Sequence, residues 1–508
     1  MLNYKVATMN KLKTLLTICF AFSAALVVAQ GRHYTTSSLG MGGGGTAYVD
    51  GYHANFINPA NLMFKTHRPK RSLGLIGGVG ARVGGTLVNI SNYNKYLTKG
   101  LTIEGQTRVN MLNDFFGSNP ENTRELSGTV NIVPFGFSNR GNKSAFSLSS
   151  RVRASEDLVI NKGLAELGFY GLDSEKFGSP TAVNFDLNVV SFGEISIGYA
   201  REVMNFDNLF FAKDVKIYAG IAPKYLIGAQ SSKMDFNSDI KVTGPNNINQ
   251  GSVVHNFNYS IYSFGDLSQQ LQDYSGARKL DQEAKLKEYV DYSGSDVGTV
   301  GSGFGLDMGV TAEMDISHIY IPVLNFFGKD KTLRLSMSLT DLGKVSFDDN
   351  PSRIYADGTF TFDGDIGDTE IGDYYDNLQD SLQNDIYGNF DSEKVGAVDY
   401  RLPGMYNFGA AITAGKLMLA IDYGFGFNNN GTNSKRSSLN LGAEYRLLGF
   451  MPLRVGTRMG GYSAAAYTAG LGLDFNYFEL TVAGSIVNNS KENGGSATGV
   501  WSGLVFRF

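Results

Sequence analysis

The chain repeats one pattern over most of its length: about ten residues of alternating apolar and polar side chains, followed by turn-forming residues. In the segment 303–315, apolar side chains fill the positions from Phe304 to Met314, and small or charged ones lie between them. The segments 417–425 and 439–447 alternate in the same way. Because successive side chains of a strand point to opposite faces, each segment predicts a strand with one apolar and one polar face.

This pattern suits either a sandwich in water or a barrel in a membrane. The segments have about the 9–11 residues that a tilted strand needs to cross hydrocarbon. Aromatic residues near the segment ends, such as Tyr423 and Phe425, are typical of membrane interfaces. We therefore predict an all-β fold, a closed antiparallel transmembrane barrel of about fourteen strands. The expected strands are 71–82, 128–138, 143–154, 186–203, 212–228, 301–316, 332–346, 402–414, 416–428, 437–448, 452–460, 464–475, 476–488 and 497–508.

The connections between these strands alternate in length. Short links are expected on the periplasmic side, and long outer loops at 83–127, 155–185, 229–300 and 347–401. Residues 348–399 hold 14 Asp or Glu against two basic residues, which favours a solvated acidic loop over a calcium site. A charged segment, 268–292, is expected to form a helix over the barrel mouth.

The polar strand faces carry charges of both signs. In a barrel these side chains line the lumen and pair across it, because buried charges need partners; a solvated sheet face is the alternative. The predicted lumen charges are Asp422, Glu444, Arg446, Arg454, Arg458, Asp474 and Glu479.

The N-terminus predicts a secretory signal peptide. Lys11 and Lys13 precede an apolar run, and small residues at its end place a cleavage site before Gln30. The one cysteine, Cys19, lies in that run, so the mature chain would form no disulfide. Charged residues are 18% of the chain against about 25% in typical soluble proteins. The net charge of −4 argues against nucleic-acid binding.

The C-terminus ends on Phe508, with Phe506 two residues before it and Gly503 five before it. This ending resembles the signal read by the bacterial barrel-insertion machinery, although Trp501 stands where a polar residue is common. Together with the signal peptide, it predicts export by the Sec route to the outer membrane of a Gram-negative cell. The expected partners there are outer-membrane lipid and the insertion machinery.

Between the signal peptide and the first strand lies a glycine-rich stretch, 38–47, followed by Asp50 and by Asn58-Pro59-Ala60-Asn61-Leu62. No Gly-Lys-Ser/Thr follows, so this is no phosphate loop. The stretch 38–62 resembles the N-terminal hatch of the long-chain fatty-acid (FadL-like) outer-membrane transporter superfamily, most closely its uncharacterised Bacteroidota members. These include relatives of a barrel subunit of the type IX secretion system. Asp341-Leu342-Gly343 is similar to a weaker feature of that superfamily.

The resemblance implies a fourteen-stranded barrel with an N-terminal plug in its lumen, and hydrophobic ligands that leave through a gap in the wall. Carried over, Gly42, Asp50, Asn58 and Pro59 belong to the hatch. Pro223, inside an expected strand, is a candidate for the lateral gap because proline weakens strand pairing. No ligand-pocket motif is recognisable.

These features divide the chain into a signal peptide (1–29), a hatch or plug (30–70) and a barrel (71–508). We expect a plugged channel for a hydrophobic or amphipathic small molecule. The alternative is a non-transporting scaffold that docks envelope proteins in secretion or surface assembly. Of the five histidines, none lies on a polar strand face opposite a Ser or Asp partner, so neither catalysis, a cofactor nor a metal site is predicted.

Overall fold

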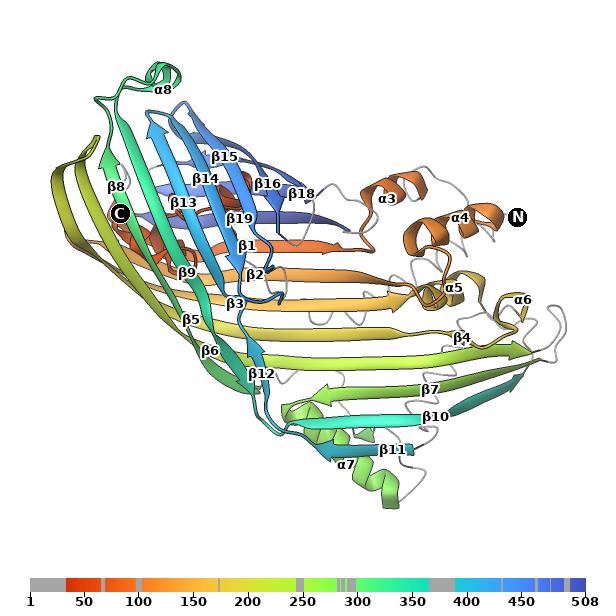
Figure 1. Cartoon of the computed structure of the whole chain (residues 1–508). Helices are drawn as coiled ribbons and strands as arrows, with labels where there is room; N and C mark the ends of the chain where they lie inside the picture. Colours follow the sequence, from red (N-terminus) through yellow and green to blue (C-terminus); the bar gives the residue numbers. More distant parts are fainter. Residues whose placement is uncertain are drawn as a thin grey trace.

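Fourteen antiparallel strands close into a barrel, with the first strand paired to the last (Figure 1). The computed structural model describes residues 33–64, 69–96, 103–171, 174–243, 251–280, 284, 288–289, 298–364, 389–430, 433–461, 465–475, 477–487 and 494–508. The wall strands are β1 (Arg71–Gly85), β2 (Thr123–Arg140), β3 (Ser144–Asn161), β5 (Phe185–Leu209), β6 (Ala212–Thr243), β8 (Gly301–Asp315), β9 (Lys331–Phe347), β13 (Met405–Ala414), β14 (Leu417–Gly426), β15 (Ser438–Leu447), β16 (Met451–Gly460), β17 (Ala466–Asp474), β18 (Phe478–Val487) and β19 (Gly495–Arg507). Each predicted segment corresponds to one wall strand, so the predicted fold and strand count are confirmed.

Alternation along the strands sorts side chains between the outside of the wall and the lumen. On β14, Leu419, Ile421 and Tyr423 are exposed, whereas the intervening Ala420 and Asp422 are buried. Outward apolar rows of this kind suit lipid, and closure pairs the backbone of every neighbouring strand as a membrane requires. We call the end of the barrel that carries Arg71 and Phe508 the terminal rim, and the opposite end the loop rim.

The strands around the wall differ greatly in length. β13 to β18 have 9 or 10 residues each, whereas β2 and β3 have 18, β5 has 25 and β6 has 32. The long strands continue past the loop rim, where β8 ends its pairing with β6 at Gly228. One side of the wall therefore projects beyond the other (Figure 1).

Short additional strands extend this projecting side. They are β4 (Thr181–Ala182), β7 (Gly251–Ser263), β10 (Ser352–Gly364), β11 (Asn389–Lys394) and β12 (Val398–Arg401). β7 pairs with the far part of β6, β10 with β7, and β11 with β10. The segments 229–300 and 347–401 were expected to be long outer loops, with a helix at 268–292. They also hold strands, because the free edge of β6 beyond β8 needs backbone partners and these segments supply them. The acidic residues from 365 to 388 lie outside the described residues.

The helices lie at the ends of the barrel, in its lumen or against the projecting sheet. They are α2 (Thr36–Gly40), η1 (Gly51–Phe56), η2 (Pro59–Met63), α3 (Ile90–Tyr96), α4 (Gly105–Phe116), α5 (Lys162–Tyr170), α6 (Ser174–Phe177), α7 (Gly265–Leu280) and α8 (Pro322–Phe327). The helix expected over the barrel mouth is α7. Its Tyr274 instead packs with Phe257 and Phe360 of the added strands, so that expectation was wrong in position.

Among the described helices, none combines the length and the apolar character needed to cross a bilayer.

Candidate functional site in the barrel lumen

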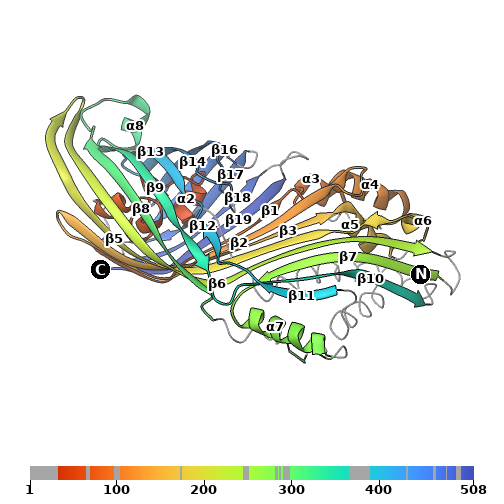
Figure 2. The same ribbon diagram turned by 60° about the horizontal axis from the view of Figure 1, so that its bottom comes forward.

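The segment 33–64 lies inside the barrel and is buried over nearly its whole length (Figure 2). It contacts strands on several sides of the lumen. The hydroxyls of Thr36 and Thr481 are 2.6 Å apart, and the amide of Thr46 donates to the Asp422 carboxylate at 2.9 Å. Its η2 turn packs against β5, β6 and β8. The segment thus bridges opposite parts of the wall.

Two asparagines of the Asn-Pro-Ala-Asn sequence fasten the segment to itself and to the wall. The Asn58 amide donates to the Thr46 carbonyl at 2.9 Å and to the Thr311 hydroxyl at 3.0 Å. The Asn61 amide donates to the carbonyls of Thr46 and Val49, and its oxygen accepts from Thr311 at 2.8 Å. Both side chains are fully buried. These bonds satisfy turn carbonyls that no helix or strand pairs.

The other hatch residues have distinct positions. Gly42 adopts a left-handed φ of 90°, and a Cβ there would lie 2.7 Å from the Thr457 carbonyl oxygen, so glycine is required. Its amide donates to the Thr468 hydroxyl at 2.9 Å. Pro59 begins η2 beside Gly220 of β6, where a side chain would collide with its backbone. Asp50 precedes η1 and lines a cavity toward the terminal rim.

That cavity, of about 350 Å³, separates the lumenal segment from the wall and contains a network of charged side chains. Glu444 accepts from Arg446 at 2.9 Å and from Arg454 at 2.7 Å. Asp474 lies 2.8 Å from Arg446 and 2.8 Å from Arg507, which also pairs with Glu479. Of the seven lumen charges named from the sequence, Glu444, Arg446, Arg454, Asp474 and Glu479 come together here.

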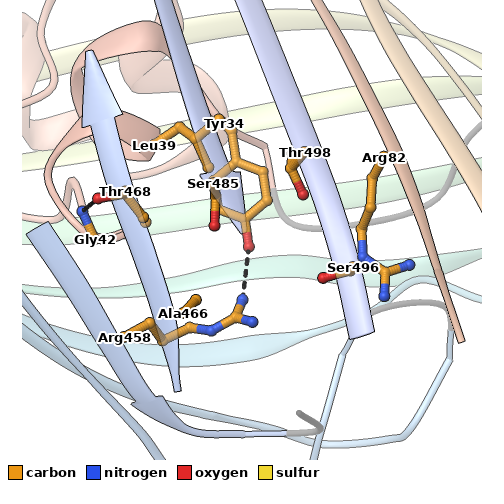
Figure 3. A pocket seen from close by; sticks show the side chains of 11 residues that line it. Tyr34, Leu39, Gly42, Arg82, Arg458, Ala466, Thr468, Ser485, Ser496 and Thr498 are labelled. Atoms are coloured by element: carbon orange, nitrogen blue, oxygen red, sulfur yellow. Dashed lines mark hydrogen bonds between the residues drawn. The ribbon is translucent and has the colours of Figure 1, made fainter. Parts of the chain in front are cut away.

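The remaining two lumen charges contact the N-terminal segment. Asp422 accepts from Thr46, as described above, and leaves no room for a side chain at Gly44. Arg458 reaches the Tyr34 hydroxyl at 3.4 Å across a small pocket of about 10 Å³ (Figure 3). That volume admits about one water molecule. Both charges therefore hold the segment in place.

A second charge cluster occupies the middle of the lumen on the long-strand side. The sequence analysis singled out only one of its members, Asp341, and did not place it in the lumen. It comprises Arg151, Arg153, Glu194, Lys224, Asp307 and Asp341, three cations and three anions, all buried. Arg151 and Arg153 lie 2.8 Å and 2.9 Å from the carboxylate oxygens of Glu194. Lys224 lies 2.6 Å from Asp341 and 2.8 Å from Asp307. The sequence signal that could have revealed this cluster is the presence of charged residues at alternating positions of neighbouring strands.

The cluster contacts the N-terminal segment through Arg151, whose guanidinium lies 4.3 Å from the centre of the Phe56 ring. Beside it, His33 and His53 share a hydrogen bond of 3.0 Å between Nε2 and Nδ1. Burial lowers the pKa of His53 to about 4, and burial together with His53 lowers the pKa of His33 well below its usual value. This pair is therefore neutral near pH 7.

The strand pairing is interrupted at one level where β19 meets β1. Between β19 and β1 the pairs stop at Gly74–Val505 and resume at Val79–Trp501. The neighbouring pairs β18–β19, β1–β2 and β2–β3 shift register at the same level. Ile76 and Leu504 there adopt left-handed φ values of 52° and 55°, which non-glycine residues seldom do. We call this region the seam.

Tyr52 of the lumenal segment covers the inner side of the seam. A Cβ at Gly74, Gly77 or Gly136 would collide with its ring, so these glycines are what allow the ring to lie flat on the wall. Its hydroxyl is 3.5 Å from the Gly77 carbonyl oxygen, to which Ser502 also donates at 3.1 Å. Tyr52 was missed from the sequence because its partners are glycines.

The structure also places Pro223 and the C-terminal residues, which were singled out from the sequence. At Pro223, pairing between β5 and β6 passes from Ser196–Lys224 to Tyr199–Ile221 without a register shift, while pairing with β8 continues through Pro223–Leu306.

The last residues complete the wall. Phe506 pairs with Leu73 and packs on Phe478, and the backbone of Phe508 exchanges two 3.1 Å hydrogen bonds with Arg71. Gly503 lies in the register shift of the seam.

Within the described ranges, no three His, Cys, Asp or Glu side chains gather in a way that would hold a metal ion. His255 lies in β7, not in a loop as expected, and His67 lies outside the described residues.

Several solved barrels have a similar fold. The toluene transporter TodX of P. putida is 11% identical, with 94% of this chain and 99% of that chain covered and a TM-score of 0.47. The Ralstonia pickettii toluene transporter TbuX is 12% identical, with coverages of 94% and 99% and a TM-score of 0.43. A Pseudomonas aeruginosa FadL homologue is 12% identical, with coverages of 95% and 100% and a TM-score of 0.41.

A search of curated proteins gave no match. One family model covers most of the sequence, from residue 59 in the lumenal segment to residue 500 in the last strand. The chain belongs to that family, the family of unknown function DUF5723.

Proposed function

We propose that the protein is a plugged outer-membrane channel through which a hydrophobic or amphipathic small molecule passes, with residues 33–64 as the plug. The single observation that carries this proposal is the seam, where one buried aromatic ring, Tyr52, covers an interrupted part of the wall. On the outer side of the seam, Leu75, Ile76 and Leu504 are exposed in the apolar belt. A molecule leaving here would enter lipid directly.

The lumen contains a packed apolar cluster on the loop-rim side of the buried charge cluster. Phe192 and Leu226 are fully buried beside Phe347, on the same strand faces as Glu194 and Lys224 of the buried charge cluster. A hydrophobic molecule that displaces these side chains would find favourable contacts there before it meets the buried charge cluster. Displacement of η1, which carries Tyr52, would then connect this region to the seam.

Uptake of a hydrophobic fluorescent probe, N-phenyl-1-naphthylamine, by cells tests the proposal. Cells that make the protein should take up the probe faster than cells that lack it, and Tyr52→Ala should increase the rate further. Tyr48→Ala is the matched control, because Tyr48 is buried in the same segment but packs toward Met41 and Ala411, away from the seam. Uptake of a monosaccharide should not change in either variant.

Equal probe uptake with and without the protein would contradict the proposal. Equal increases in both variants, accompanied by monosaccharide entry, would mean that the substitutions only loosen the plug.

A second candidate function is docking of an envelope protein. The observation that favours it is the sheet of β6, β7, β10 and β11, which projects past the loop rim and carries α7 on β10 and β11. Affinity purification from gently solubilised membranes should then recover a partner that is lost when residues 251–280 are replaced by a short linker.

A further inference from the structure

The link between β8 and β9, residues 316–330, lies on the outer side of the wall at the terminal rim. Phe327 packs edge-to-face on Tyr445, with ring centres 5.9 Å apart. Tyr445 points outward, because the alternate residues Glu444 and Arg446 point into the lumen cavity. Gly328 meets the backbone at Gly415, in the turn between β13 and β14. The link therefore crosses over that turn onto the outer surface.

An apolar cluster fixes the link to the outward rows of the wall. Ile316 and Ile319 pack with Met314 of β8, Leu333 of β9 and Ile412 of β13. Leu209, Ala212 and Val215 of the adjoining β5–β6 hairpin complete the cluster. The underside of the link is thus continuous with the lipid-facing belt of the barrel.

The other side of the link is apolar but uncovered. Tyr320, Val323 and Phe326 are 75%, 68% and 86% exposed, while Leu324 between them is buried. Phe210, at the tip of the β5–β6 hairpin, is 95% exposed. Aromatic side chains gather in this way at the boundary between hydrocarbon and water.

Several backbone groups of the link form hydrogen bonds within the link itself. The Ile321 amide donates to the Asn325 side chain at 2.9 Å, and the Asn325 amide donates to the Ile321 carbonyl at 2.8 Å. Gly328 closes α8 by donating to the Leu324 carbonyl at 3.1 Å. Local pairing lowers the cost of placing such a segment at the lipid headgroups.

We propose that residues 316–330 form an interfacial anchor, in which Tyr320, Val323 and Phe326 insert into the lipid leaflet on the side of the terminal rim. The occupant is lipid because the segment continues the outward rows of the wall along the same surface. The anchor requires that the barrel spans a bilayer but not that it transports a ligand.

The single tryptophan of the chain makes a direct test possible. Trp501 lies on the outward face of β19 and is 37% exposed. The native protein, and a Trp501→Phe, Phe326→Trp variant whose only tryptophan is in α8, are reconstituted in phosphatidylethanolamine–phosphatidylglycerol vesicles that contain chain-brominated lipid. Iodide in the buffer serves as the water-phase quencher.

We expect brominated lipid to quench the fluorescence of both proteins. In the α8 variant, bromines close to the headgroup should reduce the fluorescence more than bromines near the chain ends, and iodide should quench it less than it quenches free tryptophan.

Quenching of Trp501 by brominated lipid without quenching of the α8 tryptophan would overturn the anchor while leaving the barrel in place. If iodide also failed to reach the α8 tryptophan, a protein surface or a second copy of the chain would cover it. Absence of quenching in both proteins would instead contradict the membrane-spanning barrel, and with it both the anchor and the proposed function.

Discussion

The short strands β13 to β18 and the long strands β2, β3, β5 and β6 form the same wall but under different constraints. The short strands end with the apolar belt, and their lumen faces contact the N-terminal segment and the charges of the terminal cavity. The long strands carry four of the six residues of the buried charge cluster and continue into a projecting sheet. The difference indicates that strands keep the length of about ten residues that suits a bilayer where nothing extends the sheet, and exceed it where added strands do.

The largest effect is expected from the charge cluster of the long strands. Glu194→Gln removes the anion that Arg151 and Arg153 share, and so leaves buried cations without full compensation. Breaking a buried ion pair in this way costs about 3–5 kcal/mol. Urea unfolding of the protein in lipid vesicles, monitored by the loss of the β-strand signal in circular dichroism, would measure this change in the free energy of unfolding.

The matched control is Glu393→Gln, which breaks the half-exposed Arg353–Glu393 pair of the projecting sheet. Its unfolding midpoint should stay at the native value. Equal unfolding midpoints for both variants would mean that the buried charge cluster adds no stability to the long-strand side.

A smaller effect is expected where the N-terminal segment is fastened. Asn61→Ala removes a side-chain donor to the carbonyls of Thr46 and Val49. Asn58 still donates to the Thr46 carbonyl, so the loss falls on the buried Val49 carbonyl and costs about 1–3 kcal/mol. Hydrogen exchange followed by mass spectrometry should show faster exchange in residues 33–64, with the wall strands unchanged. Asn430→Ala, at an exposed asparagine that donates to the Arg401 carbonyl, is the control and should leave the exchange unaltered.

The smallest effect is expected from pH. His33 and His53 are neutral in the folded state because burial lowers their pKa, to about 4 for His53, against about 6.5 in an unfolded chain. The unfolded segment therefore binds more protons below pH 6.5, so the stability of the segment falls as the pH drops from 6.5 toward 4 and is constant above that range.

Hydrogen exchange in residues 33–64 should accelerate from pH 7 to pH 5 beyond the intrinsic change of exchange rate. The double substitution His33→Gln, His53→Gln should remove this excess, whereas His318→Gln, in the exposed link, should keep it. An excess that persists without both buried histidines would assign it to other groups.

The short and the long strands also differ in how well the sequence predicted them. On β13 to β18, alternation and turn residues placed the strands to within a few residues, because burial on one face and lipid on the other impose a period of two. The ends of β5 and β6 and the strands β7, β10 and β11 were missed. For β10 the reason is that its partner, β7, lies far away along the chain, so no local pattern reveals the pairing.

The candidate site divides in a similar way. Asn58 and Pro59 were recognisable from a local motif, and Glu444 and Arg454 from alternating charge. Tyr52 was not, because its position depends on Gly74, Gly77 and Gly136, which belong to two other strands. The pairing of His33 with His53 likewise depends on how the lumenal segment folds back on itself.

The location of residues 33–64 inside the barrel is the central claim, and a disulfide tests it most directly. A Cβ at Gly409 of β13 would lie 2.8 Å from the Cβ of Thr46, so a small outward shift gives disulfide geometry. The one natural cysteine, Cys19, precedes the expected mature N-terminus.

The Thr46→Cys, Gly409→Cys variant should form this bond under mild oxidation in membranes, with linked peptides found by mass spectrometry. Thr46→Cys paired with Gly499→Cys, a glycine of β19 with no neighbouring side chain in reach, should not. Absence of the first bond, or formation of both, would contradict a plug held against β13.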